Sequence, residues 1–161
     1  MKQKTRSYRN SLAALAVAGM VGLGACSDDP VGLDDHEEDV EGVQLVLNGA
    51  VIAEFDGDAR TWTGELGVEE GVETAHITVR FVDHDGSAIT LDADMYLEVD
   101  VEDETVAEFE QDTPGEFGGH LHGVAAGATE AVFKLMHGAV GTGHADFETT
   151  PVTIVVSAGG A

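Results

Sequence analysis

The 161-residue chain has little cysteine, little proline and few basic residues. Cys26 is its single cysteine, so no intramolecular disulfide can hold the fold together. Lysine and arginine together number 7, against 31 aspartates and glutamates. A surface of this charge repels nucleic acid and anionic lipid head groups, which excludes nucleic acid as a partner.

The N-terminal apolar run, "SLAALAVAGMVGLG", is too short to cross a bilayer as a helix. It follows a basic start and leads into "LGAC", which ends at Cys26. This pattern resembles the lipobox of bacterial lipoprotein signal peptides, in which the cysteine thiol is diacylated. The resemblance implies a signal peptide over residues 1–25, a lipidated Cys26 and a membrane reached through the acyl anchor. Ser27 after the cysteine favours the outer membrane in that family. The alternative is a plain secretory signal followed by a chance cysteine.

The chain after Cys26 is more acidic still, because all 31 acidic residues lie there with only Arg60, Arg80 and Lys134 as bases, which leaves a formal charge of −28. Residues 26–42 are acidic and poor in large apolar side chains, so we expect a disordered tether there. The charge itself has two interpretations: an envelope protein that attracts cations, or simple solubility.

Residues 43–158 show short apolar alternations separated by turn signals, and no helical periodicity of useful length. This predicts an all-β, antiparallel Ig-like sandwich, with residues 43–60 as an added hairpin turning at Asn48-Gly49. We expect Phe133 and Leu135 in the core. Glu130, Lys134 and Tyr96 are expected on outward faces.

The run from Val101 to His137, with the closing "VTIVVS", resembles bacterial immunoglobulin-like domains of group 2. The segments that carry the resemblance are "ETVA", "LHGVAAG" and the closing strand. The family's usual tryptophan, on the strand before "ETVA", is replaced here by Leu97 or Val99. The resemblance implies a surface or spacer module, used for binding an envelope partner, on a fold not known for catalysis. Accordingly, the chain carries no nucleophile elbow, P-loop or dinucleotide motif, and we expect no enzyme.

Four of the seven histidines cluster late in the chain. His120 and His122 flank Leu121, so we expect both on one outward strand face, about 6 to 7 Å apart. Two imidazoles at that spacing can converge on Zn, Cu or Ni. The competing interpretation is that they are ordinary polar side chains at an exposed edge.

His137 and His144 bracket the glycine-rich "GAVGTG", and Asp146 follows two residues later. If their strands pair, these three side chains form a His-His-Asp cluster suited to Zn or Cu. Because the strand ending at His137 is long, we expect two separate sites, or one near His137, rather than a single cage. Asp83 and Asp85 could hold Ca²⁺, but a solvated turn is the better interpretation.

The preferred hypothesis from sequence is therefore a non-enzymatic cell-envelope lipoprotein with an Ig-like binding or spacer module. The alternative is a divalent-metal-binding lipoprotein that uses the histidine-rich end of the sandwich.

Overall fold

The computed structural model describes residues 39–160, so the predicted signal peptide, Cys26 and most of the predicted tether lie outside the described residues. These residues belong to the second of two units, His36–Ala161. They form strands and connecting turns, and no helix among them is long and apolar enough to cross a membrane. The strands are β1 (Gly42–Leu47), β2 (Ala50–Asp56), β3 (Thr61–Gly64), β4 (Leu66–Glu69), β5 (Ile77–Val82), β6 (Met95–Val101), β7 (Ala107–Glu110), β8 (Gly118–Gly123), β9 (Gly127–His137), β10 (His144–Glu148) and β11 (Val152–Ser157).

The strands follow the apolar alternation of the sequence. In β5, Ile77, Val79 and Phe81 are buried while Arg80 between them is exposed, because successive side chains of a strand point to opposite faces. The β1–β2 hairpin turns at Asn48-Gly49, with φ angles of 52° and 82°. Positive φ at both positions is what a two-residue hairpin requires, and asparagine followed by glycine adopts it at least cost.

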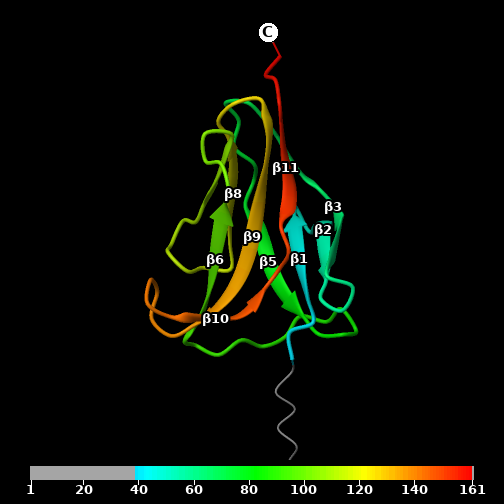
Figure 1. The fold of residues 1–161 in the computed structure, drawn as a ribbon, viewed down its shortest axis with the longest axis vertical. Coiled ribbons are helices and arrows are strands. Elements are labelled where there is room, and N and C mark those ends of the chain that lie inside the picture. Colours follow the sequence, from blue (N-terminus) through cyan, green and yellow to red (C-terminus); the bar gives the residue numbers. More distant parts are fainter. Residues whose placement is uncertain (1–38, 161) are drawn as a thin grey trace, which may run out of the picture. The chain divides into compact units, whose positions relative to one another are not determined.

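Two sheets pack into a β-sandwich, as the sequence predicted (Figure 1). The first has the order β3-β2-β1-β5-β8-β7. In the second, β9 pairs with β6, β10 and β11, and β11 pairs with β4. Seven of these strands repeat the immunoglobulin arrangement, in which strands A, B, E and D form one sheet and C, F and G the other. They are β1, β5, β8 and β7 in the first sheet and β6, β9 and β11 in the second. The fold is therefore Ig-like, and β2, β3, β4 and β10 are additions to it. β1 is itself one of the Ig-like strands, so only β2 of the hairpin expected over residues 43–60 is an addition.

The sandwich is not antiparallel throughout, which corrects one detail of the prediction. β4 runs parallel to β11, from Ile154 opposite Leu66 to Ser157 opposite Glu69. The hairpin β2–β3 places β4 at this edge, and every other pair of named strands is antiparallel. β1 also begins at Gly42, the last residue of the range expected as tether.

β9 organises the second sheet because it is the longest strand, with 11 residues. β6 covers one edge of it, pairing with residues 131–137. On the other edge, β11 pairs with residues 127–131 and β10 with residues 134–137, so β10 and β11 lie end to end. In Figure 1, β10 accordingly crosses the lower end of β9. The C-terminal end of β9 is thus enclosed by strands on both edges.

The core lies between the two sheets. Phe133 and Leu135 of β9 are buried and Glu130 is exposed, as predicted. The added strand β3 supplies the tryptophan that β6 lacks. The ring of Trp62 lies 5.9 Å from that of Phe133, and its Nε1–H donates a hydrogen bond to the Thr150 carbonyl over 2.7 Å. Strand β3 therefore completes the core from outside the seven Ig-like strands.

Two outward side chains were predicted wrongly. Tyr96 is buried, because the turns containing Gly115 and Gly143 fold over its ring. Lys134 is half-buried rather than exposed, and its ammonium group pairs with Glu98 and Asp100 of β6. The outer face of this sheet is therefore partly covered by loops and ion pairs.

Candidate metal sites

His137 and His144 face each other across the β9–β10 pair. His137 is the last residue of β9, His144 is the first of β10, and the two are direct cross-strand partners. Directly opposite residues of an antiparallel pair project from the same face, and here the ring centroids are 5.4 Å apart. The β10 strand then bulges between Ala145 and Phe147, which places Asp146 outside the regular register. The bulge turns this carboxylate toward both imidazoles.

Asp146 contacts both rings. Its Oδ2 lies 3.4 Å from His137 Nδ1, and its Oδ1 lies 2.9 Å from His144 Nε2. One ligand atom from each residue can be chosen so that all three lie within 4.8 Å of one another. We call His137, His144 and Asp146 the β9–β10 cluster. The structure thus brings together three of the five metal-ligand candidates named from the sequence.

Asp94 fixes the orientation of the His137 ring. Its Oδ2 lies 2.9 Å from His137 Nε2, and because a carboxylate only accepts, Nε2 carries the proton. In the neutral ring Nδ1 is then the unprotonated nitrogen, and it faces Asp146. A carboxylate behind a ligating imidazole is the usual outer partner of histidine–metal bonds. The hydrogen bond to Asp94 also raises the pKa of His137, and the charge of Asp146 adds to this rise.

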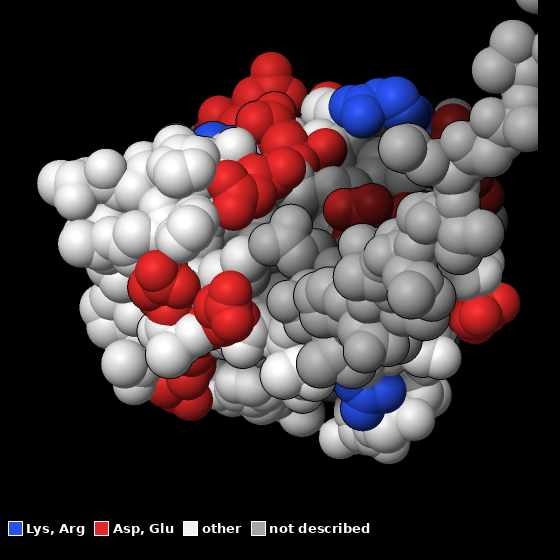
Figure 2. Space-filling model, turned by 90° about the horizontal axis from the view of Figure 1, so that it is seen from below, with Lys and Arg blue, Asp and Glu red and all other residues white. Residues whose placement is uncertain are grey.

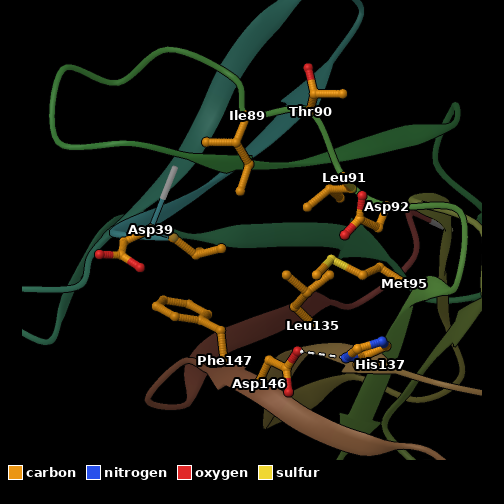
Figure 3. A pocket seen from close by; sticks show the side chains of 11 residues that line it. Asp39, Ile89, Thr90, Leu91, Asp92, Met95, Leu135, His137, Asp146 and Phe147 are labelled. Atoms are coloured by element: carbon orange, nitrogen blue, oxygen red, sulfur yellow. Dashed lines mark ion pairs between the residues drawn. The ribbon is translucent and has the colours of Figure 1, made fainter. Parts of the chain in front are cut away.

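Two imidazoles and a carboxylate are donors that Zn²⁺ and Cu²⁺ accept. Neighbouring ligands of a tetrahedral zinc ion lie about 3.4 Å apart, given bonds of about 2.0 to 2.2 Å. The separation of His137 Nδ1 from Asp146 already has this value. Three protein ligands leave a fourth position open. His137 and Asp146 also line a pocket of about 780 Å³, with Met95, Leu135 and Phe147 beside them (Figure 3). A small ligand could reach the open position from that pocket.

His120 and His122 lie on the same outward face of β8, but they do not converge on one ion. His122 Nδ1 lies 3.9 Å from Glu108 Oε2 on β7. His120 Nδ1 donates to the Thr74 carbonyl over 2.9 Å, and its ring packs edge-on against that of His76. The two pairs of histidines also lie on different sheets. The expected pairing of His120 with His122 is therefore replaced by a pairing with His76.

The turn at Asp83 is a hydrogen-bonded turn. Asp83 Oδ1 accepts hydrogen bonds from the backbone N–H groups of Asp85 and Ser87, each over 2.9 Å. His84, between them, lies beside Asp85 at 3.4 Å and is largely exposed. Aspartate commonly closes a turn in this way, which agrees with the interpretation preferred from the sequence.

Sequence reasoning missed Asp94 and His76. Asp94 lies next to Met95, the cross-strand partner of His137, but only the register of β6 against β9 reveals this. His76 precedes β5 and reaches His120 across the β5–β8 pairing. Neither contact could be predicted from the spacing of residues in the sequence, because each joins residues more than 40 positions apart.

The fold and these contacts define the chain as an Ig-like β-sandwich protein with clusters of histidines and carboxylates on its surface. No family model and no curated protein matches it. Among solved structures, the crystal structure of the S-layer protein SbsC domains 4 and 5 is similar to it, with 19% sequence identity and a TM-score of 0.43. The match covers 59% of this chain and 48% of that chain, so this chain spans about half the length of that structure.

Proposed function

We propose that this chain is a non-enzymatic cell-envelope lipoprotein, anchored through Cys26, whose sandwich binds a divalent transition-metal ion, Zn²⁺ or Cu²⁺, at the β9–β10 cluster. The observation that carries the metal site is the convergence of His137, His144 and Asp146. Asp94 holds one of the two rings in the tautomer that a metal needs.

The charge of the domain supports cation binding at this end. Asp92 lies in the pocket beside His137, and Asp94 contacts the ring directly. Figure 2 shows the sandwich from below, with acidic side chains spread over this face and few basic ones. Negative potential around a cluster raises the local concentration of cations. The charge attracts any cation, and selectivity for a transition metal has to come from the two imidazoles.

The metal site is tested by thermal melts of the purified full chain carrying Cys26→Ser, so that the thiol cannot bind metal. Zn²⁺ should stabilise the fold by about 2.7 kcal/mol when free metal is about a hundredfold above its Kd. Ca²⁺ should do much less at moderate salt, because salt screens the surface charge. His137→Ala/His144→Ala should lower the stabilisation by Zn²⁺, whereas His84→Ala, in an exposed turn, should leave it at the level of the parent. Equal stabilisation by Zn²⁺ and Ca²⁺ in the parent and both variants would refute the site.

The envelope anchor rests on the "LGAC" pattern, and its test is separate. Cys26→Ser should abolish incorporation of a palmitate analogue and release the protein from membranes. A parent protein without label, which fractionates like the variant, would refute the lipoprotein assignment and leave the metal site untouched.

A passive spacer is the second candidate function. It is favoured by the course of the chain, which enters β1 at one end of the sandwich and leaves β11 at the other (Figure 1). Domains with opposite entry and exit suit an extended arrangement. A chain that shows no selective response to Zn²⁺ or Cu²⁺ while remaining anchored would favour this function over metal binding.

A further inference from the structure

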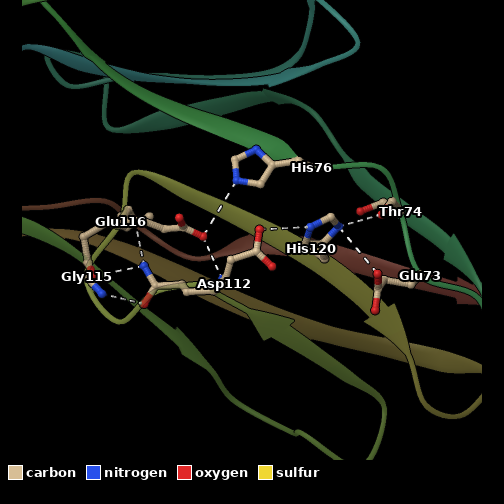
Figure 4. Close-up of polar contacts among 9 residues, drawn as sticks. Glu73, Thr74, His76, Asp112, Gly115, Glu116 and His120 are labelled. Carbon is tan, nitrogen blue, oxygen red and sulfur yellow. Dashed lines mark hydrogen bonds and ion pairs between the residues drawn. The ribbon is translucent and has the colours of Figure 1, made fainter.

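A second group of histidines and carboxylates lies on the first sheet. His76 precedes β5 and His120 lies on β8, while Asp112 and Glu116 come from the turn between β7 and β8 (Figure 4). We call these four residues the β5–β8 cluster. Ligand atoms of His76, Asp112 and Glu116 all lie within 4.8 Å of one another, and His120 contacts Asp112.

The turn that carries the two carboxylates is held in place by its own hydrogen bonds. The Gln111 amide donates to the Glu116 carbonyl over 2.7 Å, and its oxygen accepts from the Gly115 N–H over 3.3 Å. The Asp112 N–H donates to Glu116 Oε1 over 2.7 Å. The turn and the Glu116 carboxylate are therefore held in place before any ligand arrives.

Gly118 makes room for the His76 ring. A Cβ atom at this position would lie 2.3 Å from His76 Cε1 and 2.6 Å from the Ile77 carbonyl oxygen. Only glycine lets the ring lie this close to the β8 backbone, beside the ring of His120 at a centroid distance of 5.3 Å. The two imidazoles thus meet through a close approach that the β5–β8 pairing enforces.

The distances in this cluster fit a shared metal ion better than hydrogen bonds. His76 Nε2 lies 3.8 Å from Glu116 Oε1, and His120 Nε2 lies 3.6 Å from Asp112 Oδ2. Both separations are too long for an N–H···O hydrogen bond. They are close to the separation of about 3.4 Å between neighbouring ligands of tetrahedral zinc. Because His120 Nδ1 donates to the Thr74 carbonyl, Nε2 is the unprotonated nitrogen of the neutral ring, and it faces Asp112.

We propose that the β5–β8 cluster is a second binding site for a divalent transition-metal ion such as Zn²⁺, with His76, His120, Asp112 and Glu116 as its ligands. Ligand atoms of His76, Asp112 and Glu116 already converge, and His120, which contacts Asp112, would complete a set of four where the β9–β10 cluster has three. A complete tetrahedral set is typical of sites that hold a metal structurally. The ion would join β5, β8 and the turn before β8.

Zn²⁺ stoichiometry tests this site independently of the first. The full chain carrying Cys26→Ser is titrated with Zn²⁺ in competition with a chromogenic chelator at moderate salt. We expect the parent chain to bind two Zn²⁺ ions in competition with the chelator. The His76→Ala/His120→Ala variant and the His137→Ala/His144→Ala variant should each bind one. The matched control is His84→Ala/His122→Ala, which removes two histidines outside both clusters and should leave two ions. Circular dichroism without metal checks that each variant folds.

The outcomes separate the two proposals. If His76→Ala/His120→Ala binds as many ions as the parent, the β5–β8 site is refuted and the proposed function stands. If His137→Ala/His144→Ala alone binds as many Zn²⁺ ions as the parent, metal binding at the β9–β10 cluster is refuted and the β5–β8 site stands. Should the His76→Ala/His120→Ala chain fail to fold, Asp112→Asn/Glu116→Gln replaces it. That variant keeps the shape of the turn, and it must lose one ion if the proposal holds.

Discussion

The β9–β10 and β5–β8 clusters contain the same kinds of side chain but are built differently. The first joins two strands that are consecutive in the chain and cross-strand partners, with a bulge turning Asp146 inward. The second joins a strand, the residue before another strand and a turn, and glycine at position 118 allows their approach. The first is therefore a local arrangement, whereas the second depends on the long-range pairing of β5 with β8.

This difference has a consequence for stability. A metal that links residues separated by a long stretch of chain restricts the unfolded state more than one that links neighbours. Binding at the β5–β8 cluster should therefore depend more strongly on the intact sandwich. Binding at the β9–β10 cluster needs only β9, β10 and the Asp94 contact from the start of β6.

The largest expected effect comes from the core that supports both clusters. Phe133→Ala should lower the free energy of unfolding by about 3 to 5 kcal/mol, because it removes a fully buried ring and leaves a cavity. The Trp62 and Phe109 rings, at 5.9 and 5.7 Å, lose their partner. Urea denaturation measures the change. A variant as stable as the parent would contradict the placement of β9 at the centre of the sandwich.

A smaller effect is expected at Lys134, which lies on β9 and belongs to neither cluster. Its ammonium group pairs with Asp100 and Glu98, and the hydrogen bond to Asp100 raises its pKa most. Lys134→Met should cost about 1 kcal/mol, since both carboxylates are partly exposed and then repel each other. Zn²⁺ affinity should not change. Urea denaturation and a Zn²⁺ titration of the same sample check both statements, and altered affinity would show that surface charge governs binding.

The pH dependence should have opposite signs with and without metal. The pKa of His137 is raised, so without metal its protonated form contributes stability that is present below about 6.5 and lost as pH rises through the folded pKa. With Zn²⁺, protons compete with the metal for the ring, so the Zn²⁺ affinity should decrease as the pH is lowered. Because the pKa of His137 is raised, this decrease should begin at a pH above 6.5. Melts of the parent and His137→Ala across this range measure both trends. The same sign in both conditions would contradict Zn²⁺ binding by His137.

The smallest effect is expected at His122, which lies near the β5–β8 cluster without belonging to it. His122→Ala should change stability by no more than about 0.5 kcal/mol, as for most surface substitutions. It should leave Zn²⁺ binding at both clusters intact, because its ring faces Glu108 on β7. Calorimetric titration tests this, and the loss of an ion would reinstate His122 as a ligand in place of His76.

The sequence predicted the sandwich well, because core strands must alternate apolar and polar residues. β5 and the hairpin turn at Asn48-Gly49 both carry strong local signals. The burial of Tyr96 was missed because loops from distant parts of the chain cover the outer face of β6, and loops leave no periodic pattern. The parallel pairing of β4 with β11 was missed for a similar reason, since it depends on where the hairpin β2–β3 ends.

The candidate sites divide in the same way. His137, His144 and Asp146 could be grouped from sequence, because a short glycine-rich loop between two strands brings its ends together. The pairing of His120 with His76 could not, because strand order across a sheet is set by the whole fold. Alternation along one strand correctly placed His120 and His122 on one face. It carried no information on which neighbouring element each ring contacts.

The most direct test of the account observes the imidazole nitrogens themselves. A long-range ¹H–¹⁵N spectrum of the ¹⁵N-labelled chain carrying Cys26→Ser is recorded before and after one equivalent of Zn²⁺, then two. The account predicts that Nδ1 of His137 and Nε2 of His144 shift to the range of zinc-bound nitrogen, while both nitrogens of His84 and His122 do not. The imidazole nitrogens of His76 and His120 should shift at a different Zn²⁺ addition from those of His137 and His144. Zn²⁺ that leaves the His137 and His144 rings unchanged at both additions would contradict the metal site at the β9–β10 cluster.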